Sequence, residues 1–230
     1  MTGAPRSAMI FAAGFGTRMG ALTRTRPKPM IEVSGRPLID HTLDLARDAG
    51  IGTIVANLHY LAPILAAHLG PQGVEISDES GEILETGGGL KAALPLLGPD
   101  PVVTMNSDAI WAGPNPVRLL QGAWNPARMD ALLMCVPVAQ ALGHSGKGDF
   151  AANDQGQLSR GPGLVYGGIQ IVKTDGLAGI SERVFSLNLL WDRMHGDGRL
   201  FGLAYPGRWC DVGHPEGITL AESLIGPADV

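Results

Sequence analysis

The stretch AMIFAAGFGTRMG, residues 8–20, decides the fold of this chain. Residues 8–13 form a continuous apolar run, which is the pattern of a strand buried on both faces of a parallel sheet. Gly14 and Gly16 follow at once and predict a tight loop whose backbone a ligand can approach closely. A buried first strand that ends in such a loop favours an α/β fold, in which ligands bind beyond the carboxyl ends of the strands.

Apolar runs and helical periodicities alternate along the rest of the chain. Pro37 opens a helix, Ile39, Leu43 and Ala46 recur on one of its faces, and Gly50 ends it. Further strands are expected at residues 53–56, 74–77, 102–105, 129–138, 164–172, 203–205 and 209–212. Further helices are expected at residues 62–69, 88–97, 187–195 and 215–225. This alternation predicts a largely parallel sheet with helices on both faces.

The composition indicates a folded chain. Hydrophobic residues make up 45% and charged residues 17% of the 230 residues, which excludes a disordered chain. No repeat or boundary is visible, so residues 1–230 are expected to form a single domain. Residues 1–7 are polar and expected to be loose. Residues 139–163 hold many Gly, Ser and Asn and are expected to form a loop or hairpin that faces the active site.

The charge balance and the cysteines limit the classes of partner. The net charge is −5 and the pI about 5.6, which argues against a nucleic-acid-binding protein. Basic residues without acidic ones gather in residues 18–28, which favours a small anionic ligand or, alternatively, a solvated loop. No apolar stretch reaches the roughly 20 residues of a membrane helix. Cys135 and Cys210 have no zinc spacing and suit a reducing cytoplasm, and self-association into a homo-oligomer stays open.

The glycine loop has the groups that bind phosphate. Its backbone amides, together with Arg18 and Lys28, can surround an anionic ligand, although a loop of glycines can also be an ordinary turn. Two familiar phosphate motifs are excluded, because G-x-G-x-x-G would need glycine where Met19 stands and no Walker A string is present. Residues 143–147 approach the G-x-S-x-G of serine hydrolases, but Lys147 breaks that pattern.

Two longer pieces carry a resemblance: residues 12–19 read AAGFGTRM, and residues 26–30 read RPKPM. Together they resemble the signature of the sugar-phosphate nucleotidyltransferases, although Ala21 stands where that signature usually has Pro. Later pieces extend the resemblance over most of the chain: VSGRPL (33–38), NLHY (57–60), ETGGG (85–89), NSD (106–108) and WCDVG (209–213). The resemblance implies a Rossmann-like three-layer α/β/α sandwich with a mostly parallel, mixed central sheet. Within the family, the chain is most similar to the N-acetylmuramate 1-phosphate uridylyltransferases of cell-wall recycling.

The resemblance also implies roles for individual residues. Arg18, Lys28 and Asp108 are expected to be catalytic, and Asp108 and Asp211, each at a strand end, are expected to hold Mg²⁺. The expected nucleotide contacts are Ala12, Ala13, Gly14, Gly16, Thr17, Asn57, Glu85, Gly87, Gly88 and Asn106. The expected sugar-phosphate contacts are Lys147, Asp149 and Gly168, the last in a glycine pair inside a strand.

Several of these assignments have a structural alternative. Asp108 could be a turn residue, Asp211 a surface strand end, and Glu85 and Lys147 solvated charges. The triple glycine at residues 87–89 is expected to open a helix and leave a flat space for a base, but a flexible turn would explain it as well.

The implied reaction joins UTP to a sugar 1-phosphate, by the resemblance N-acetylmuramic acid 1-phosphate, and releases pyrophosphate. The second pKa of a phosphate monoester is about 6, so the attacking phosphate is already ionised at neutral pH and needs no general base. Mg²⁺, Arg18, Lys28 and the loop amides would bring the two polyanions together. Two rival functions stay open: transfer between another pair, such as GTP and mannose 1-phosphate, and a non-catalytic sugar-nucleotide sensor.

Overall fold

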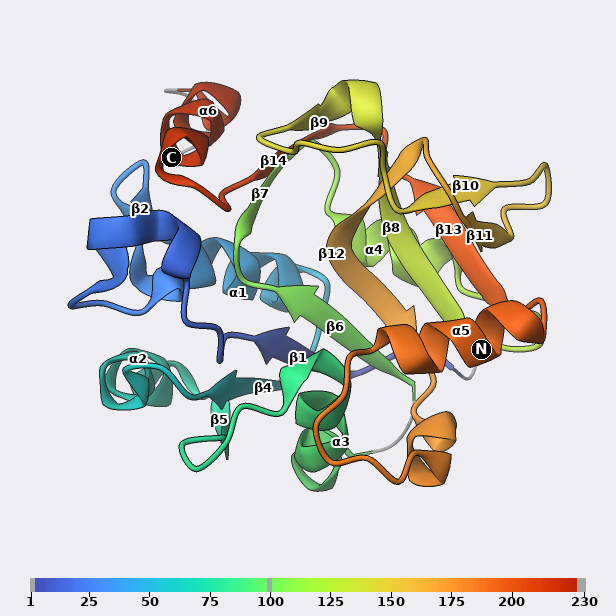
Figure 1. Cartoon of the computed structure of the whole chain (residues 1–230), viewed down its shortest axis with the longest axis horizontal. Coiled ribbons are helices and arrows are strands. Elements are labelled where there is room, and N and C mark those ends of the chain that lie inside the picture. The colour runs from blue at the N-terminus through green and yellow to red at the C-terminus, as the bar shows by residue number, and fades with distance from the viewer. Residues whose placement is uncertain (1–2, 99–100, 227–230) are drawn as a thin grey trace.

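Strands and helices alternate through the first half of the chain, and the computed structural model describes residues 3–98 and 101–226 (Figure 1). The strands are β1 (Ser7–Phe11), β2 (Glu32–Val33), β3 (Arg36–Pro37), β4 (Thr53–Leu58), β5 (Glu75–Asp78), β6 (Val102–Asn106), β7 (Ala109–Ala112), β8 (Ala131–Pro137), β9 (Ala141–Leu142), β10 (Phe150–Ala152), β11 (Leu158–Arg160), β12 (Leu164–Val172), β13 (Leu200–Ala204) and β14 (Arg208–Asp211). The α-helices are α1 (Leu38–Asp48), α2 (Ala62–Leu69), α3 (Glu85–Leu97), α4 (Pro116–Ala123), α5 (Asn188–Gly196) and α6 (Pro215–Ile225). The 3₁₀ helices are η1 (Thr17–Thr23), η2 (Lys28–Met30), η3 (Gly70–Gln72), η4 (Val138–Gln140) and η5 (Asp175–Gly179).

A nine-stranded mixed sheet runs through the centre of the molecule (Figure 1). Its parallel part has the order β5-β4-β1-β6, with β1 between β4 and β6. The sheet continues through β12, which is antiparallel to β6 and β8, and β13 then pairs in parallel with β8. Parallel neighbours need crossover connections, and α1, α2 and α3 supply them.

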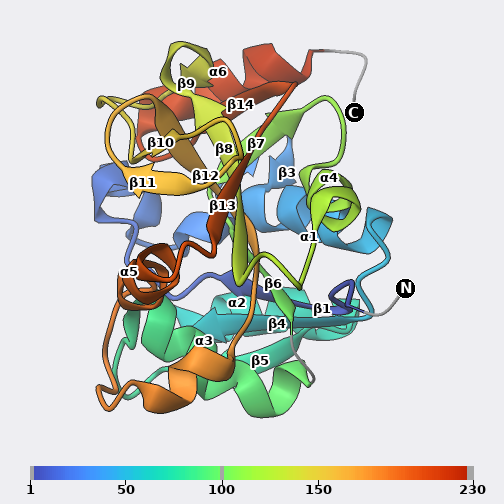
Figure 2. The same cartoon turned by 90° about the vertical axis from the view of Figure 1, so that its right-hand side faces the viewer.

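Alternate residues of β1 belong to two different cores. Ala8 and Ile10 pack with α1, α2 and α4, whereas Met9 packs with α3 and α5. Figure 2 shows α1 and α4 on one side of the sheet and α3 and α5 on the other. The sequence had predicted a strand buried on both faces, and the two cores confirm it. The predicted three-layer α/β/α sandwich with a mixed central sheet is likewise confirmed.

A smaller sheet of β7, β14 and β9 adjoins the carboxyl end of β6. Helix α6 packs on this sheet through an apolar cluster that includes Cys210, Val212 and Leu224. Strand β14 is antiparallel to β7, and its last residue, Asp211, lies opposite Ala109. This pairing brings Asp211 next to the segment that follows β6.

Two predicted boundaries near the glycine loop and the triple glycine were wrong. β1 ends at Phe11 instead of residue 13, because the Ala12 N–H donates to the Asn57 side chain and leaves the ladder. α3 begins at Glu85 instead of residue 88. α2 spans Ala62–Leu69, as predicted, and η3 follows it and ends at Gly73, which has a left-handed backbone (φ 74). β7 and α4 were not predicted from the sequence.

The remaining predicted segments contain regular structure or buried side chains. Residues 139–163 contain β9 and the antiparallel hairpin of β10 and β11. Ser7 is buried in β1 and pairs with Thr53, so the strand begins inside the segment predicted to be loose; residues 1–2 lie outside the described residues. Cys135 and Cys210 are free thiols and buried. Within the described part of the chain, none of the helices combines the length and the apolar content that a membrane crossing requires.

Candidate active site

The glycine loop after β1 folds back onto the segment that carries Lys28. Gly16 has a left-handed backbone (φ 63), and a Cβ added there would lie 2.8 Å from Lys28 Cβ and 3.0 Å from Thr23 Cγ2. Only glycine therefore allows this approach. The Thr23 hydroxyl donates to the Gly16 carbonyl (3.1 Å) and holds the loop in place. Gly14 has open space around it, so its backbone is accessible to a ligand.

A cavity of about 230 Å³, here called the phosphate cavity, lies over this loop. Backbone amides together with arginine and lysine side chains are the groups that bind phosphate. The sequence-predicted residues that line it are Ala12, Gly14, Gly16, Thr17, Arg18, Lys28 and Asp108. The other lining residues, which were not predicted as site residues, are Phe11, Pro29, Ser107 and Gly213. The structure thus brings residues from β1, η1, η2 and the end of β6 to one cavity.

The two predicted carboxylates converge at the edge of this cavity. Lys28 Nζ donates to Asp108 Oδ2 at 2.7 Å, and the two side chains are only 11% and 30% exposed. A Cβ added at Gly213 would lie 2.8 Å from Asp211 Oδ2 and 3.1 Å from a terminal nitrogen of Arg18. The carboxylate of Asp211 and the guanidinium of Arg18 therefore flank Gly213, which leaves the space between them free.

Burial raises the pKa of the Asp211 carboxyl, and the negative charge of Asp108 raises it further. Lys28, Arg18 and His144 act in the opposite direction and lower it, but they do not cancel the effect of burial. A carboxylate that is desolvated beside a second carboxylate favours a bound cation.

The pair fits a magnesium site that substrate completes. Mg²⁺ binds through one or two carboxylates together with substrate phosphates and water, instead of an all-protein cage. Among the described residues, no group of three or more His, Cys, Asp or Glu side chains is placed to hold a metal ion. Asp108 and Asp211 would supply the carboxylates, and phosphate oxygens in the phosphate cavity would supply further ligands.

A second cavity of about 240 Å³, here called the nucleoside cavity, shares Phe11, Gly14 and Asp108 with the first. Its other walls are Ala13, Asn57, Glu79, Ile83, Glu85, Thr86 and Asn106. Glu85 has a left-handed backbone (φ 59), which is strained for a residue with a side chain and costs on the order of 1–3 kcal/mol. The walls are apolar where Phe11 and Ile83 lie and acidic where Glu79 and Glu85 lie.

The structure does not bring Gly87 and Gly88 to this cavity. Both glycines are buried inside α3, and their N–H groups donate to the Phe185 carbonyl at 2.9 and 3.0 Å. The space beside them is filled, because a Cβ at Gly87 would meet the Phe185 ring and one at Gly88 would meet the Arg183 carbonyl. The flat surface that the sequence predicted for a base is therefore covered by residues 183–185.

The residues predicted to contact the sugar phosphate are spread out. Asp149 Oδ2 accepts from the Tyr166 N–H (2.9 Å), which ties the loop to β12. Lys147 is exposed, and it lines neither of the two cavities. Gly168 has a left-handed backbone (φ 94), and a Cβ there would lie 2.9 Å from Asn106 Cβ. Of the three, Gly168 is in contact with a residue of the nucleoside cavity.

His144 was not predicted as a site residue. Its charge acts on Asp211, and the preceding Gly143 packs directly on the Asp211 carbonyl. Its Nε2 is buried and has no hydrogen-bond partner among the residues that the structure describes. The sequence signal was the histidine in residues 143–147, which was considered only as part of a hydrolase motif.

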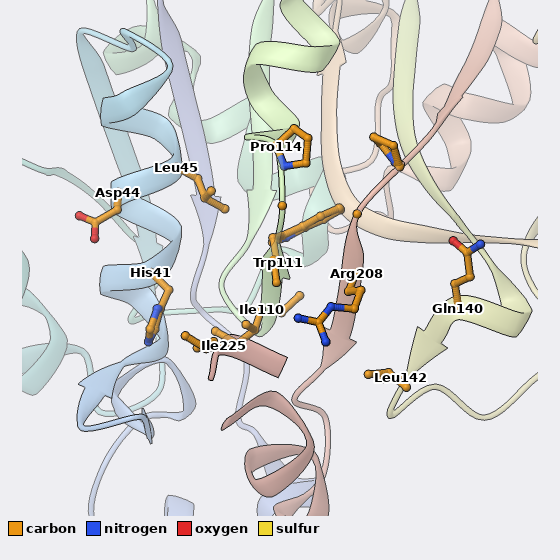
Figure 3. Close-up of a pocket in the computed structure, with 15 residues that line it drawn as sticks. His41, Asp44, Leu45, Ile110, Trp111, Pro114, Gln140, Leu142, Arg208 and Ile225 are labelled. Carbon is orange, nitrogen blue, oxygen red and sulfur yellow. The ribbon is translucent and has the colours of Figure 1, made fainter. Parts of the chain in front are cut away.

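A larger cavity, of about 1080 Å³, lies along β7 and beside Arg208 of β14, and its lining includes Ala109, the residue that follows Asp108 (Figure 3). Figure 3 shows His41 and Asp44 on α1 and Arg208 on β14. These side chains are already bound within the protein: His41 to Val33 O (3.1 Å), Asp44 to Arg36 (2.6 Å) and Arg208 to Leu224 O (2.9 Å). No predicted site residue is among the described residues that line this cavity.

Known proteins with similar sequence and structure identify the family. The MobA-like NTP transferase domain matches residues 8–147. The chain is 41% identical to the N-acetylmuramate alpha-1-phosphate uridylyltransferase of Caulobacter vibrioides over 99% of this chain and 100% of that protein. It is 33% identical to the protein of the same name from Neisseria meningitidis, over 95% and 98% of the two chains. The chain belongs to the MobA-like NTP transferase family, and the resemblance to sugar-phosphate nucleotidyltransferases is confirmed.

The fold agrees with that family. A putative glucose-1-phosphate thymidylyltransferase from Bacillus anthracis superimposes with a TM-score of 0.81 at 18% identity. The superposition covers 97% of this chain and 96% of the other. At this identity the likeness concerns the fold alone.

Proposed function

We propose that this enzyme transfers a uridylyl group from UTP to N-acetylmuramic acid 1-phosphate and releases pyrophosphate, as a step of cell-wall recycling. The observation that carries the proposal is the convergence of Asp108 and Asp211 with Arg18 and Lys28 over the glycine loop. The likeness to two N-acetylmuramate alpha-1-phosphate uridylyltransferases over nearly the whole chain supports the choice of base and sugar. The buried, free cysteines support a reducing cytoplasm as the place of action.

The chemistry requires positioning and charge neutralisation more than proton transfer. The attacking group is a phosphate monoester, which is largely ionised at neutral pH. The amides around Gly14 and Gly16 bind the phosphates of the nucleotide, and Arg18 and Lys28 stabilise the charge that moves onto pyrophosphate. Mg²⁺, when bound, neutralises charge on the phosphates that meet there, and Asp108 and Asp211 would hold it.

The proposed position of each part of the substrates follows from the two cavities. The triphosphate occupies the phosphate cavity, and the base and ribose occupy the nucleoside cavity, because the two cavities meet at Gly14 and Asp108. The sugar 1-phosphate then approaches from the side of Gly168 and of the loop that carries Lys147 and Asp149. Lys147 of this loop is exposed and forms no ion pair with the residues that the structure describes, so it can pair with the second phosphate.

A substrate panel tests the proposal. Pyrophosphate release should be fastest for UTP with N-acetylmuramic acid 1-phosphate, and chelation of Mg²⁺ should abolish it. Turnover with GTP and mannose 1-phosphate instead would assign the enzyme to another pair. Nucleotide binding without any turnover across the panel would indicate a sensor and would contradict the proposal.

A further inference from the structure

Glu85 holds a backbone conformation that a residue with a side chain rarely adopts. Its φ is 59, in the left-handed region, where the Cβ crowds the following carbonyl oxygen. Within the described part of the chain, the other residues with a Cβ and a positive φ lie in turns: Ser34 with Gly35 joins β2 to β3, and Leu61 precedes α2. Glycine would adopt the same backbone at residue 85 without strain. Strain of this kind is typical of functional sites, so the side chain at residue 85 is a candidate for ligand binding.

Hydrogen bonds on both sides of Glu85 hold its backbone in place. Before it, the Leu84 carbonyl accepts from the Phe185 N–H (3.2 Å). After it, the Thr86 hydroxyl oxygen accepts from the Leu187 N–H (3.0 Å). Both neighbours of Glu85 are therefore fixed to the segment that covers the start of α3. A side chain whose backbone is fixed in this way is preorganised for its ligand.

The Glu85 carboxylate is open to a ligand. Glu85 lines the nucleoside cavity and is exposed, and no hydrogen bond or ion pair with the described residues occupies its oxygens. The two other carboxylates of this cavity differ, because Glu79 accepts from two donors of the protein and Asp108 accepts from Lys28 Nζ. Of the three, Glu85 is the one whose two oxygens meet no donor within the described part of the chain.

We propose that the Glu85 carboxylate accepts the 2′- and 3′-hydroxyls of the ribose and thereby selects ribonucleotides over 2′-deoxyribonucleotides. The proposal rests on the nucleotidyl transfer proposed above. An ionised carboxylate only accepts hydrogen bonds, so its partner must bring donors, which excludes the anionic phosphate oxygens. The two neighbouring hydroxyls of a ribose supply two donors for its two oxygens. An acidic residue binds the ribose 2′-hydroxyl in dinucleotide-binding α/β folds.

The position of Glu85 also favours the ribose over the base. The ribose joins the base to the phosphates, and the nucleoside cavity meets the phosphate cavity at Gly14 and Asp108. Glu79 is 3% exposed, whereas Glu85 is exposed, so the cavity is enclosed at the first residue and open at the second. A planar base gains most from the enclosed part, because burial of its faces is favourable. The polar ribose suits the open part, where Glu85 lies.

Deoxynucleotides test this contact on the unaltered protein. Calorimetry with Mg²⁺ and no sugar phosphate should show 2′-deoxy-UTP binding roughly 10- to 100-fold more weakly than UTP, as expected for a lost hydrogen bond to a charged group. 3′-Deoxy-UTP should also bind more weakly than UTP. Binding of either analogue as tight as that of UTP would overturn the proposal.

Matched variants assign the preference to Glu85. Glu85→Gly removes the carboxylate and the backbone strain together, so the preference for UTP over 2′-deoxy-UTP should disappear while the Tm stays equal or rises. Ser34→Gly makes the same change at a left-handed residue that lines neither cavity, and it should keep the preference. Glu82→Gln removes a nearby exposed charge, which pairs with Arg183 at 3.5 Å, and should keep the preference as well.

The variants also separate this contact from a purely structural role. A folded Glu85→Gly protein that keeps the full preference for UTP would contradict the proposal; if it does not fold, the deoxynucleotide series decides. Because binding is measured without turnover, a failure of the proposed transfer reaction is detected separately, in the substrate panel. If that panel selects GTP, the comparison of GTP with 2′-deoxy-GTP applies the same test.

Discussion

Replacing Gly16 by alanine tests whether the glycine loop is held against Lys28. Gly16 has φ 63, and a left-handed conformation costs a residue with a Cβ roughly 1–2 kcal/mol. The new Cβ would also meet Lys28 Cβ at 2.8 Å, and crowding of this kind adds about 1–3 kcal/mol. The sum, about 2–5 kcal/mol, corresponds to a decrease in Tm of roughly 4–20 °C for a chain of this size.

The same substitution should also reduce activity. Lys28 Nζ is bonded to Asp108 at 2.7 Å, so a displaced loop moves a cation that the reaction needs. A misplacement approaching 1 Å lowers a rate by about 100-fold, so Gly16→Ala should lower kcat on the order of 10- to 100-fold.

Gly35→Ala is the matched control. Gly35 also has a left-handed backbone (φ 73), but no atom lies within 4 Å of an added Cβ, so only the backbone cost applies. Thermal denaturation should show a smaller decrease in Tm for Gly35→Ala, and its kcat should equal that of the unaltered enzyme. Equal decreases in Tm for the two variants, with kcat unchanged in both, would refute the close contact between the loop and Lys28.

Three further predictions concern the same site. Arg18→Ala should cost about 2–4 kcal/mol of transition-state stabilisation, seen as a lower kcat in steady-state kinetics; a change in KM alone would mean that Arg18 binds substrate and transition state equally. Asp211→Asn should abolish turnover but raise the Tm of the metal-free protein at pH 8, because burial and the charge of Asp108 raise the pKa of this carboxyl and its ionised form destabilises the native state. This increase in Tm should become smaller as the pH falls, because Asp211 of the unaltered protein then becomes protonated. A Tm of Asp211→Asn below that of the unaltered protein at pH 8 would contradict the assignment. Trp209→Phe leaves the Gly167 carbonyl without the indole N–H that donates to it at 3.0 Å. We therefore expect the free energy of unfolding to fall by about 1–3 kcal/mol. The KM for the sugar phosphate should rise more than the KM for UTP does.

The sequence was sufficient for the parts of the site that local pattern determines. The run of residues 8–13 predicted a doubly buried strand, and the glycines after it predicted the phosphate cavity, because strand, loop and cations lie close together in sequence. Asp108 and Asp211 could be placed because both were expected at strand ends, where ligands of α/β folds bind. In the structure Asp108 lies two residues after β6, and Asp211 ends β14 of the smaller sheet. Their convergence beside Arg18 and Lys28 agrees with that expectation.

Contacts between distant segments were the ones that the sequence could not show. The triple glycine at residues 87–89 was expected to leave an open surface, but residues 183–185 cover Gly87 and Gly88, and nothing in the neighbouring sequence indicates that contact. Glu79 was missed because an acidic residue in a polar string is usually solvated, whereas here Asn57 and the Leu84 N–H bury it. Gly89 now has a reason that the sequence did not suggest, since it leaves room for the Glu79 carboxylate.

Product formation by the unaltered enzyme and by Asp108→Asn tests the central claim most directly. With UTP, N-acetylmuramic acid 1-phosphate and Mg²⁺, mass spectrometry should detect UDP-N-acetylmuramic acid and an equal amount of pyrophosphate for the unaltered enzyme. Asp108→Asn should keep the folded state and form no product. Product formation by Asp108→Asn at the rate of the unaltered enzyme, or none by either protein across the panel of nucleotides and sugar phosphates, would contradict the role assigned to this carboxylate pair.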